Sequence, residues 1–228
     1  VIALLVLMRL WLRISGSFAV PMIFAVHPVH TESAAWAAGA PDFLFSAFLL
    51  GALWFAAQER NAKKIFPFVA SMTLYALALG SKEVAIVCFP LFGIVAAESE
   101  GGSRFDLKAA VKASAPYALL AAIFFGLRWS VLGSVSREIQ GAPDIVTSIF
   151  SIPSVALFYL KQAFFPFYLA ANHPLRPAEV PGFWNLILPL LIVALAGWII
   201  WKVSKGSPVR WFGFGGSVLA LLPAFNIT

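Results

Sequence analysis

The chain has 228 residues, of which 61% are hydrophobic and only 11% are charged, and its mean hydropathy is +0.90. A soluble domain carries roughly 25% charged residues, so this chain cannot cover its apolar side chains with polar ones. These values exclude a soluble enzyme, a disordered chain and a disulfide-stapled secreted domain. The single cysteine, Cys88, has no partner for an intrachain disulfide.

The apolar segments predict an all-α polytopic transmembrane bundle, because a spanning helix needs roughly 20 mostly apolar residues. We interpret residues 1–8 as the tail of a helix that begins earlier. About seven spans are then predicted at 14–26, 42–57, 65–80, 84–97, 115–132, 183–201 and 211–225. Residues 145–167 are also apolar, but Pro153, Lys161, Gln162 and Pro166 interrupt them, which is typical of a re-entrant or interfacial helix.

The distribution of Lys and Arg predicts the orientation, because cytoplasmic loops carry an excess of both. Alternate loops on one side hold 11 of the 16 basic residues, so we expect that side to be cytoplasmic. The net charge of +6 then needs no nucleic-acid partner. All three histidines and six of the ten acidic residues fall on the other side, so the polar chemistry is expected to be extracytoplasmic.

The first candidate site is the run His27-Pro28-Val29-His30-Thr31-Glu32, at the extracytoplasmic end of a predicted span. Pro28 suits the first turn of a helix, which would put His30 and Glu32 within one turn of each other. Two imidazoles and a carboxylate can act as general acid and base, hydrogen-bond a phosphate or bind a metal ion. The spacing matches no strong zinc pattern, and helix capping with anchoring at the membrane interface is the structural alternative.

Two further patterns place charges at the ends of apolar segments. Asp42 precedes the run Phe43-Leu44-Phe45, where it can cap a helix N-terminus or face a polar cavity. Lys82 and Glu83 stand between two apolar segments with almost no loop, and adjacent residues of a helix point roughly 100° apart. Ionisable residues at the edge of hydrocarbon usually face a cavity or a partner, so Lys82 is a candidate phosphate ligand. A charged hairpin tip in water is the alternative.

A fourth pattern runs from Tyr159 to Tyr168 and combines aromatic residues with Lys161, ahead of His173-Pro174. It suits a membrane-surface segment that holds a lipid headgroup. An ordinary aromatic belt at the membrane interface is the alternative. The residue composition of the segment does not distinguish these two interpretations.

Taken in this order, HPVHTE at 27–32, LALGSKEVAIVCFP at 77–90 and LLPAFN at 221–226 resemble one family. They are similar to the membrane portion of the transmembrane and tetratricopeptide-repeat O-mannosyltransferases and their prokaryotic relatives, which belong to the GT-C glycosyltransferase class. The resemblance covers about residues 17–226. Relatives usually carry Gly-Arg-Lys-Asp where this chain has Gly39-Ala40-Pro41-Asp42, so the basic residue is missing here.

The resemblance implies an enzyme that transfers a sugar, with mannose as the candidate, from a polyprenyl or dolichyl phosphate to a hydroxyl acceptor. The expected acceptor is protein Ser or Thr, and the expected location is the extracytoplasmic face of a bacterial inner membrane or an endoplasmic reticulum membrane. The catalytic pocket would contain His27, His30, Glu32 and Asp42, and the substrate would be bound by Lys82, Glu83, Arg128 and Arg176. Membrane lipids, the lipid-linked donor and the protein acceptor are the implied partners.

The family carries a key acidic residue in its first extracytoplasmic loop and tetratricopeptide repeats after its last spans. Residues 1–228 are therefore expected to form one GT-C-like domain of a longer protein, without that loop and without the repeats. Two alternatives are a transporter or flippase-like protein for a lipid-linked or anionic solute, and a non-catalytic membrane scaffold. No cofactor is assigned, and a requirement for a divalent metal ion stays open.

Overall fold

The computed structural model describes residues 22–23, 26–28, 39–62, 65–97, 106–133, 144–166 and 181–203. Every regular element within these ranges is a helix, and the ranges contain no strand. The predicted all-α class is confirmed for this part of the chain. The predicted span at 211–225 and most of the one at 14–26 lie outside the described residues.

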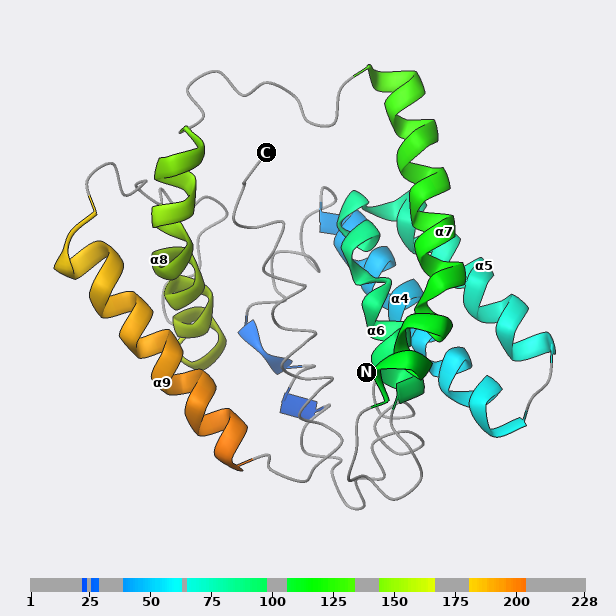
Figure 1. Ribbon diagram of the computed structural model, residues 1–228, viewed down its shortest axis with the longest axis horizontal. Coiled ribbons are helices and arrows are strands. Elements are labelled where there is room, and N and C mark those ends of the chain that lie inside the picture. The colour runs from blue at the N-terminus through cyan, green and yellow to red at the C-terminus, as the bar shows by residue number, and fades with distance from the viewer. Residues whose placement is uncertain are drawn as a thin grey trace.

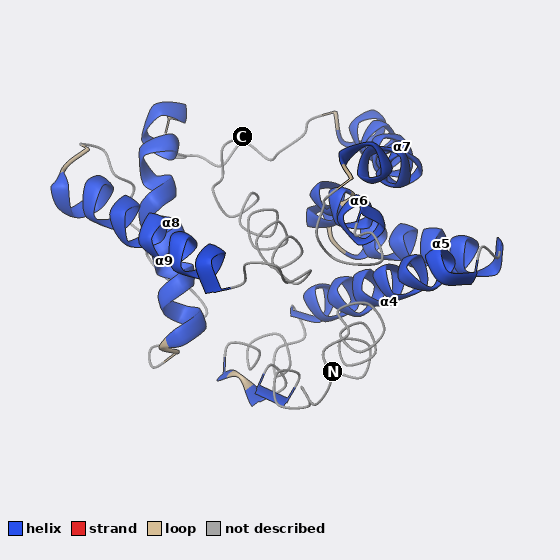
Figure 2. Cartoon of the chain, turned by 60° about the horizontal axis from the view of Figure 1, so that its bottom comes forward, coloured by secondary structure: helices blue, strands red, loops and turns tan. Residues whose placement is uncertain are grey.

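The helices follow one another as Figure 1 shows. The first group is α4 (Ala40–Ala62), α5 (Ile65–Ser81), the 3₁₀-helix η3 (Glu83–Cys88), α6 (Pro90–Ala97) and α7 (Leu107–Leu132). The second group is α8 (Ile145–Phe164), the π-helical turn η4 (Phe183–Ile187) and α9 (Leu188–Val203). In Figures 1 and 2, α8 and α9 lie beside each other on the left, and the α4–α7 group lies on the right.

The α4–α7 group packs around a core of buried apolar side chains, with α4 against α5 and α6 against α7. Leu53, Tyr75 and Phe92 from three different helices are almost completely buried in this core. Backbones also approach closely: a Cβ atom at Gly93 of α6 would lie 2.5 Å from the carbonyl oxygen of Ala110 in α7. Close contact through small residues is the usual way in which helices associate inside lipid, where the hydrophobic effect between them is absent.

Three helical stretches are long and apolar enough to cross a membrane, namely Ala40–Gln58, Leu107–Leu132 and Phe183–Lys202. Two shorter apolar stretches are Ile65–Ser81 and Glu83–Ala96. The large apolar side chains that cover α7 and α9 are mostly exposed, as surfaces that face lipid are. These features are those of an integral membrane protein.

The helix boundaries agree with the predicted segments in some places and differ in others. The segment predicted at 65–80 is helical from Ile65 to Ser81, as expected. The segment predicted as one span at 84–97 is divided at Phe89 into η3 and α6. Pro90 explains this division, because it has no N–H to donate and disfavours a helical conformation in the residue before it.

Two N-terminal aspartates set the starts of α7 and α8. The carboxylate of Asp106 accepts hydrogen bonds from the N–H groups of Lys108 (2.9 Å) and Ala109 (3.1 Å), so α7 begins several residues before the predicted 115. Asp144 accepts a hydrogen bond from the N–H of Thr147 (3.3 Å) at the start of α8. α8 continues through Pro153 as one helix to Phe164.

Candidate functional site

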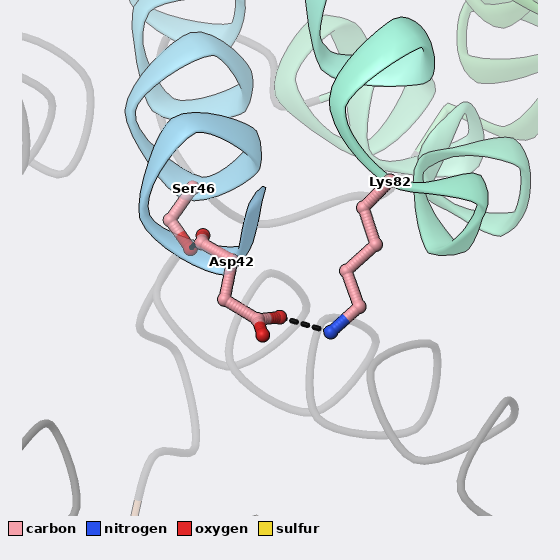
Figure 3. Close-up of polar contacts among 3 residues, drawn as sticks. All are labelled: Asp42, Ser46 and Lys82. Carbon is pink, nitrogen blue, oxygen red and sulfur yellow. Dashed lines mark hydrogen bonds and ion pairs between the residues drawn. The ribbon is translucent and has the colours of Figure 1, made fainter. Parts of the chain in front are cut away.

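Asp42 lies in the first turn of α4, where the sequence predicted a helix start. A carboxylate there interacts favourably with the partial positive charge of the helix N-terminus. The carbonyl oxygen of Asp42 accepts a hydrogen bond from Ser46 Oγ (2.8 Å), which leaves the carboxylate itself available for another partner. Figure 3 shows that this carboxylate points toward Lys82.

Lys82 is the single residue between α5 and η3. Its N–H donates to the carbonyl oxygen of Ala78 (3.1 Å) and its own carbonyl oxygen accepts from the N–H of Ala85 (3.1 Å), so one residue closes one helix and opens the next. Its backbone is extended, with φ −153° and ψ 132°. The side chain of Lys82 extends toward the start of α4, where it forms an ion pair with Asp42.

Glu83 pairs with a third helix. Its Oε2 atom lies 3.4 Å from the Nη2 atom of Arg128, which stands in the last part of α7. Lys82 and Glu83 are therefore neighbours in sequence that bind partners on different helices, in agreement with the predicted divergence of their side chains. Both pairs are partly solvent-exposed, and pairs of this kind stabilise a fold by only about 0–1 kcal/mol each.

The two ion pairs bring together one end of α4, α5 and α7. Of the predicted site residues, Asp42, Lys82, Glu83 and Arg128 meet here, and their formal charges cancel. Each cation has a carboxylate beside it. An anionic ligand that binds here therefore competes with these carboxylates for the cations, and the roughly one-third exposure of the Lys82 side chain gives it access.

His27 joins the first and the fourth sequence patterns. Its Nε2 atom lies 3.0 Å from the carbonyl oxygen of Ala163, in the last turn of α8. This contact places His27, the first residue of the HPVHTE run, beside the middle of the aromatic segment from Tyr159 to Tyr168. His30, Glu32 and Arg176 lie outside the described residues.

The structure also contains buried hydrogen bonds within the α4–α7 group that were not predicted. Ser71 Oγ donates to the carbonyl oxygen of Ala52 (2.7 Å), which uses its one hydrogen, so the hydroxyl of Tyr117 donates to Ser71 Oγ (2.8 Å). The hydroxyl of Tyr75 donates to the carbonyl oxygen of Ala85 (2.9 Å). Tyr75 thus fixes η3 two residues after Glu83. In the sequence, the only sign of this contact is that Tyr75 places a hydroxyl group inside an apolar segment.

The described residues contain no group of three His, Cys, Asp or Glu side chains that could hold a metal ion. No protein-family model matches the chain, and no curated protein or solved structure matches it. The chemistry of the site is therefore argued from its own geometry. That geometry is a neutral cluster of two cations and two carboxylates at the ends of apolar helices.

Proposed function

We propose that this chain is the membrane portion of a GT-C-type glycosyltransferase. It would transfer a sugar, with mannose as the candidate, from a polyprenyl or dolichyl phosphate to the hydroxyl of a protein Ser or Thr. The observation that supports this proposal best is the position of Lys82, an accessible ammonium group at the junction of two apolar helices. A lipid-linked phosphate brings its anionic group to the edge of the hydrocarbon region, where a compact cation suits it.

In this proposal the donor phosphate exchanges places with a carboxylate. Lys82 and Arg128 would hold the phosphate, while Asp42 and Glu83 neutralise these cations when no donor is bound. Cations on the phosphate also stabilise the negative charge that grows on it as the glycosidic bond breaks. His27, His30, Glu32 and Asp42 would shape the catalytic pocket, as the family resemblance implies.

The proposed membrane arrangement has about seven spans, with α8 as a re-entrant or interfacial helix. α8 is not one of the three stretches that satisfy the length and hydropathy of a span, and it contains Pro153, Lys161 and Gln162. The ion pairs would face the extracytoplasmic side, because α7 carries Lys108 and Lys112 at its opposite end. Arg176 remains a further candidate phosphate ligand by its sequence position.

The first test replaces Lys82 in the full chain and measures binding of a polyprenyl-phosphate sugar. Lys82→Met should weaken donor binding about 10- to 150-fold, because a charge-assisted hydrogen bond contributes about 1.5–3 kcal/mol. Lys82→Arg should retain part of the affinity, since charge matters more than shape. Lys108→Met is the matched control, because Lys108 lies in the first turn of α7, far from Arg128, and should leave binding unchanged.

Equal donor binding by Lys82→Met and the parent chain would contradict the assignment of the phosphate site. Binding that depends on Lys82, together with movement of the lipid-linked sugar across vesicles and no transfer to an acceptor, would favour the transporter alternative. Transfer that depends on Lys82 supports the glycosyltransferase.

A further inference from the structure

A second site lies at the opposite end of the α4–α7 group. A pocket of about 420 Å³ is lined by all four of these helices, and most of its wall is apolar. Ala56 contributes from the last part of α4, Phe68 from the first part of α5, and Ala96 from the end of α6. Asp42 and Lys82 stand at the other ends of α4 and α5, so this pocket is separate from the ion pairs.

Among the described residues, Lys112 of α7 is the one charged residue in the pocket wall. Its side chain is exposed, and within the described part of the chain no carboxylate forms an ion pair with it. The pocket therefore combines an apolar interior with one ammonium group in its wall.

Pro116 lines the same pocket one turn after Lys112. Lys112 offers an ammonium group at one edge of this apolar pocket. A ligand with an anionic group and an apolar chain matches this combination.

From this geometry we infer that the pocket binds an anionic phospholipid of the surrounding membrane, with its phosphate on Lys112 and an acyl chain in the apolar interior that α4, α5, α6 and α7 line. Basic pockets between transmembrane helices commonly hold anionic headgroups, and the volume lies within the usual range for ligand sites of about 300–1,000 Å³. Both α4 and α7 line the pocket, and both contain a stretch that is apolar enough to span a membrane. The lipid around such helices is therefore the apolar ligand that is available to the pocket. The inference does not depend on the proposed function.

The test titrates the full chain in detergent with phosphatidylglycerol and with phosphatidylcholine of identical acyl chains, and measures bound lipid by native mass spectrometry. The parent chain should bind phosphatidylglycerol more tightly. Lys112→Met should raise the dissociation constant for phosphatidylglycerol about fivefold, because one lysine near an anionic headgroup contributes about that factor. It should leave phosphatidylcholine binding unchanged.

A second variant tests the apolar part of the pocket. Ala113 lines it, so Ala113→Phe should fill it and weaken the binding of both lipids. Ala115→Phe is the matched control, because Ala115 is exposed on α7 and is not part of the wall; it should bind both lipids like the parent. Lys202→Met on α9 is the matched control for the charge and should leave phosphatidylglycerol binding unchanged.

Parent-like binding of phosphatidylglycerol by Lys112→Met would overturn the inference, and so would parent-like binding by a folded Ala113→Phe. Lys112→Met changes an exposed side chain and leaves the core intact, so its result stands even if Ala113→Phe fails to fold. Inorganic phosphate at millimolar concentration should not displace the lipid. Displacement that depends on Lys112 would overturn the lipid assignment in favour of a site for free phosphate.

Discussion

For Lys82, the environment in the structure differs most from the one expected from the sequence. The sequence presents it as a cation at the end of an apolar segment, whereas the structure gives it a carboxylate partner from a helix 40 residues away. A cation with such a partner binds an anion only in competition with that partner. Asp42 therefore influences the affinity of the proposed phosphate site even if it never touches the donor.

Replacing this carboxylate should have the opposite effect to replacing the lysine. Asp42→Asn removes the negative charge and keeps the size of the side chain, so donor binding should tighten by up to about fivefold, the equivalent of a partly exposed ion pair. A binding titration with the lipid-linked donor measures this change. Weaker binding in Asp42→Asn would show that Asp42 positions Lys82 instead of competing for it.

Gly93 is required by the close approach of two helices. Gly93→Ala would place a methyl group 2.5 Å from the carbonyl oxygen of Ala110, and both atoms belong to helices that cannot shift independently of the core. We expect a loss of about 1–3 kcal/mol in the free energy of unfolding, measured by denaturation in detergent. Gly126→Ala on α7 is the control, because a Cβ there meets no atom within 4 Å, and it should be neutral or slightly stabilising. Equal stability of the two variants would contradict the packing of α6 on α7.

At the scale of elements, the ends of the helices follow local hydrogen bonds. α7 begins after Asp106 and ends at Gly133, whose positive φ of 68° is easily adopted by glycine and whose N–H donates to the carbonyl oxygen of Trp129. The break between η3 and α6 follows from Pro90. Boundaries of this kind depend on a few neighbouring residues, but the prediction from hydropathy missed both of these: α7 begins at Leu107 and not at 115, and the predicted span at 84–97 is divided at Phe89.

The start of α8 should depend on pH. The side-chain hydrogen bond with Thr147 is the main cause that lowers the pKa of Asp144 below its ordinary value. A carboxyl with a lowered pKa stabilises the folded state above its unfolded pKa, and this contribution is lost as pH falls through the folded pKa, below about pH 4. The backbone N–H groups in the first turn of α8 should therefore exchange faster below about pH 4, after correction for intrinsic exchange rates.

The control for this effect is Asp144→Asn, which keeps a capping oxygen but does not titrate. Its exchange should show no step in the same pH range. A step of the same size in Asp144→Asn would mean that another group controls the start of α8.

At the scale of the whole molecule, α7 connects the two proposed sites. Arg128 stands near its end beside Glu83, and Lys112 stands near its beginning beside the pocket. Sixteen residues of helix separate them, which corresponds to about 24 Å. The two sites thus belong to opposite ends of one helix that is long and apolar enough to span a membrane.

This arrangement predicts that the two ends of α7 face opposite sides of the membrane. In a Cys88→Ala background, Lys108→Cys should react with an impermeant thiol reagent from the cytoplasmic side and Ser130→Cys from the other side. The helix between them is about 33 Å long, which exceeds a hydrocarbon core of about 30 Å. Labelling of both positions from the same side would reject a transmembrane α7 and the sidedness derived from the basic residues.

By itself, the sequence determined the helical class, the apolar stretches and approximate helix ends, because hydropathy and capping act within a few residues. It also indicated that Lys82 and Glu83 diverge. Only the tertiary structure decided that these charges pair with Asp42 and Arg128, and that an apolar pocket lies beside Lys112. These features depend on which helices pack together, and partners so far apart in the chain leave no local pattern from which to predict them.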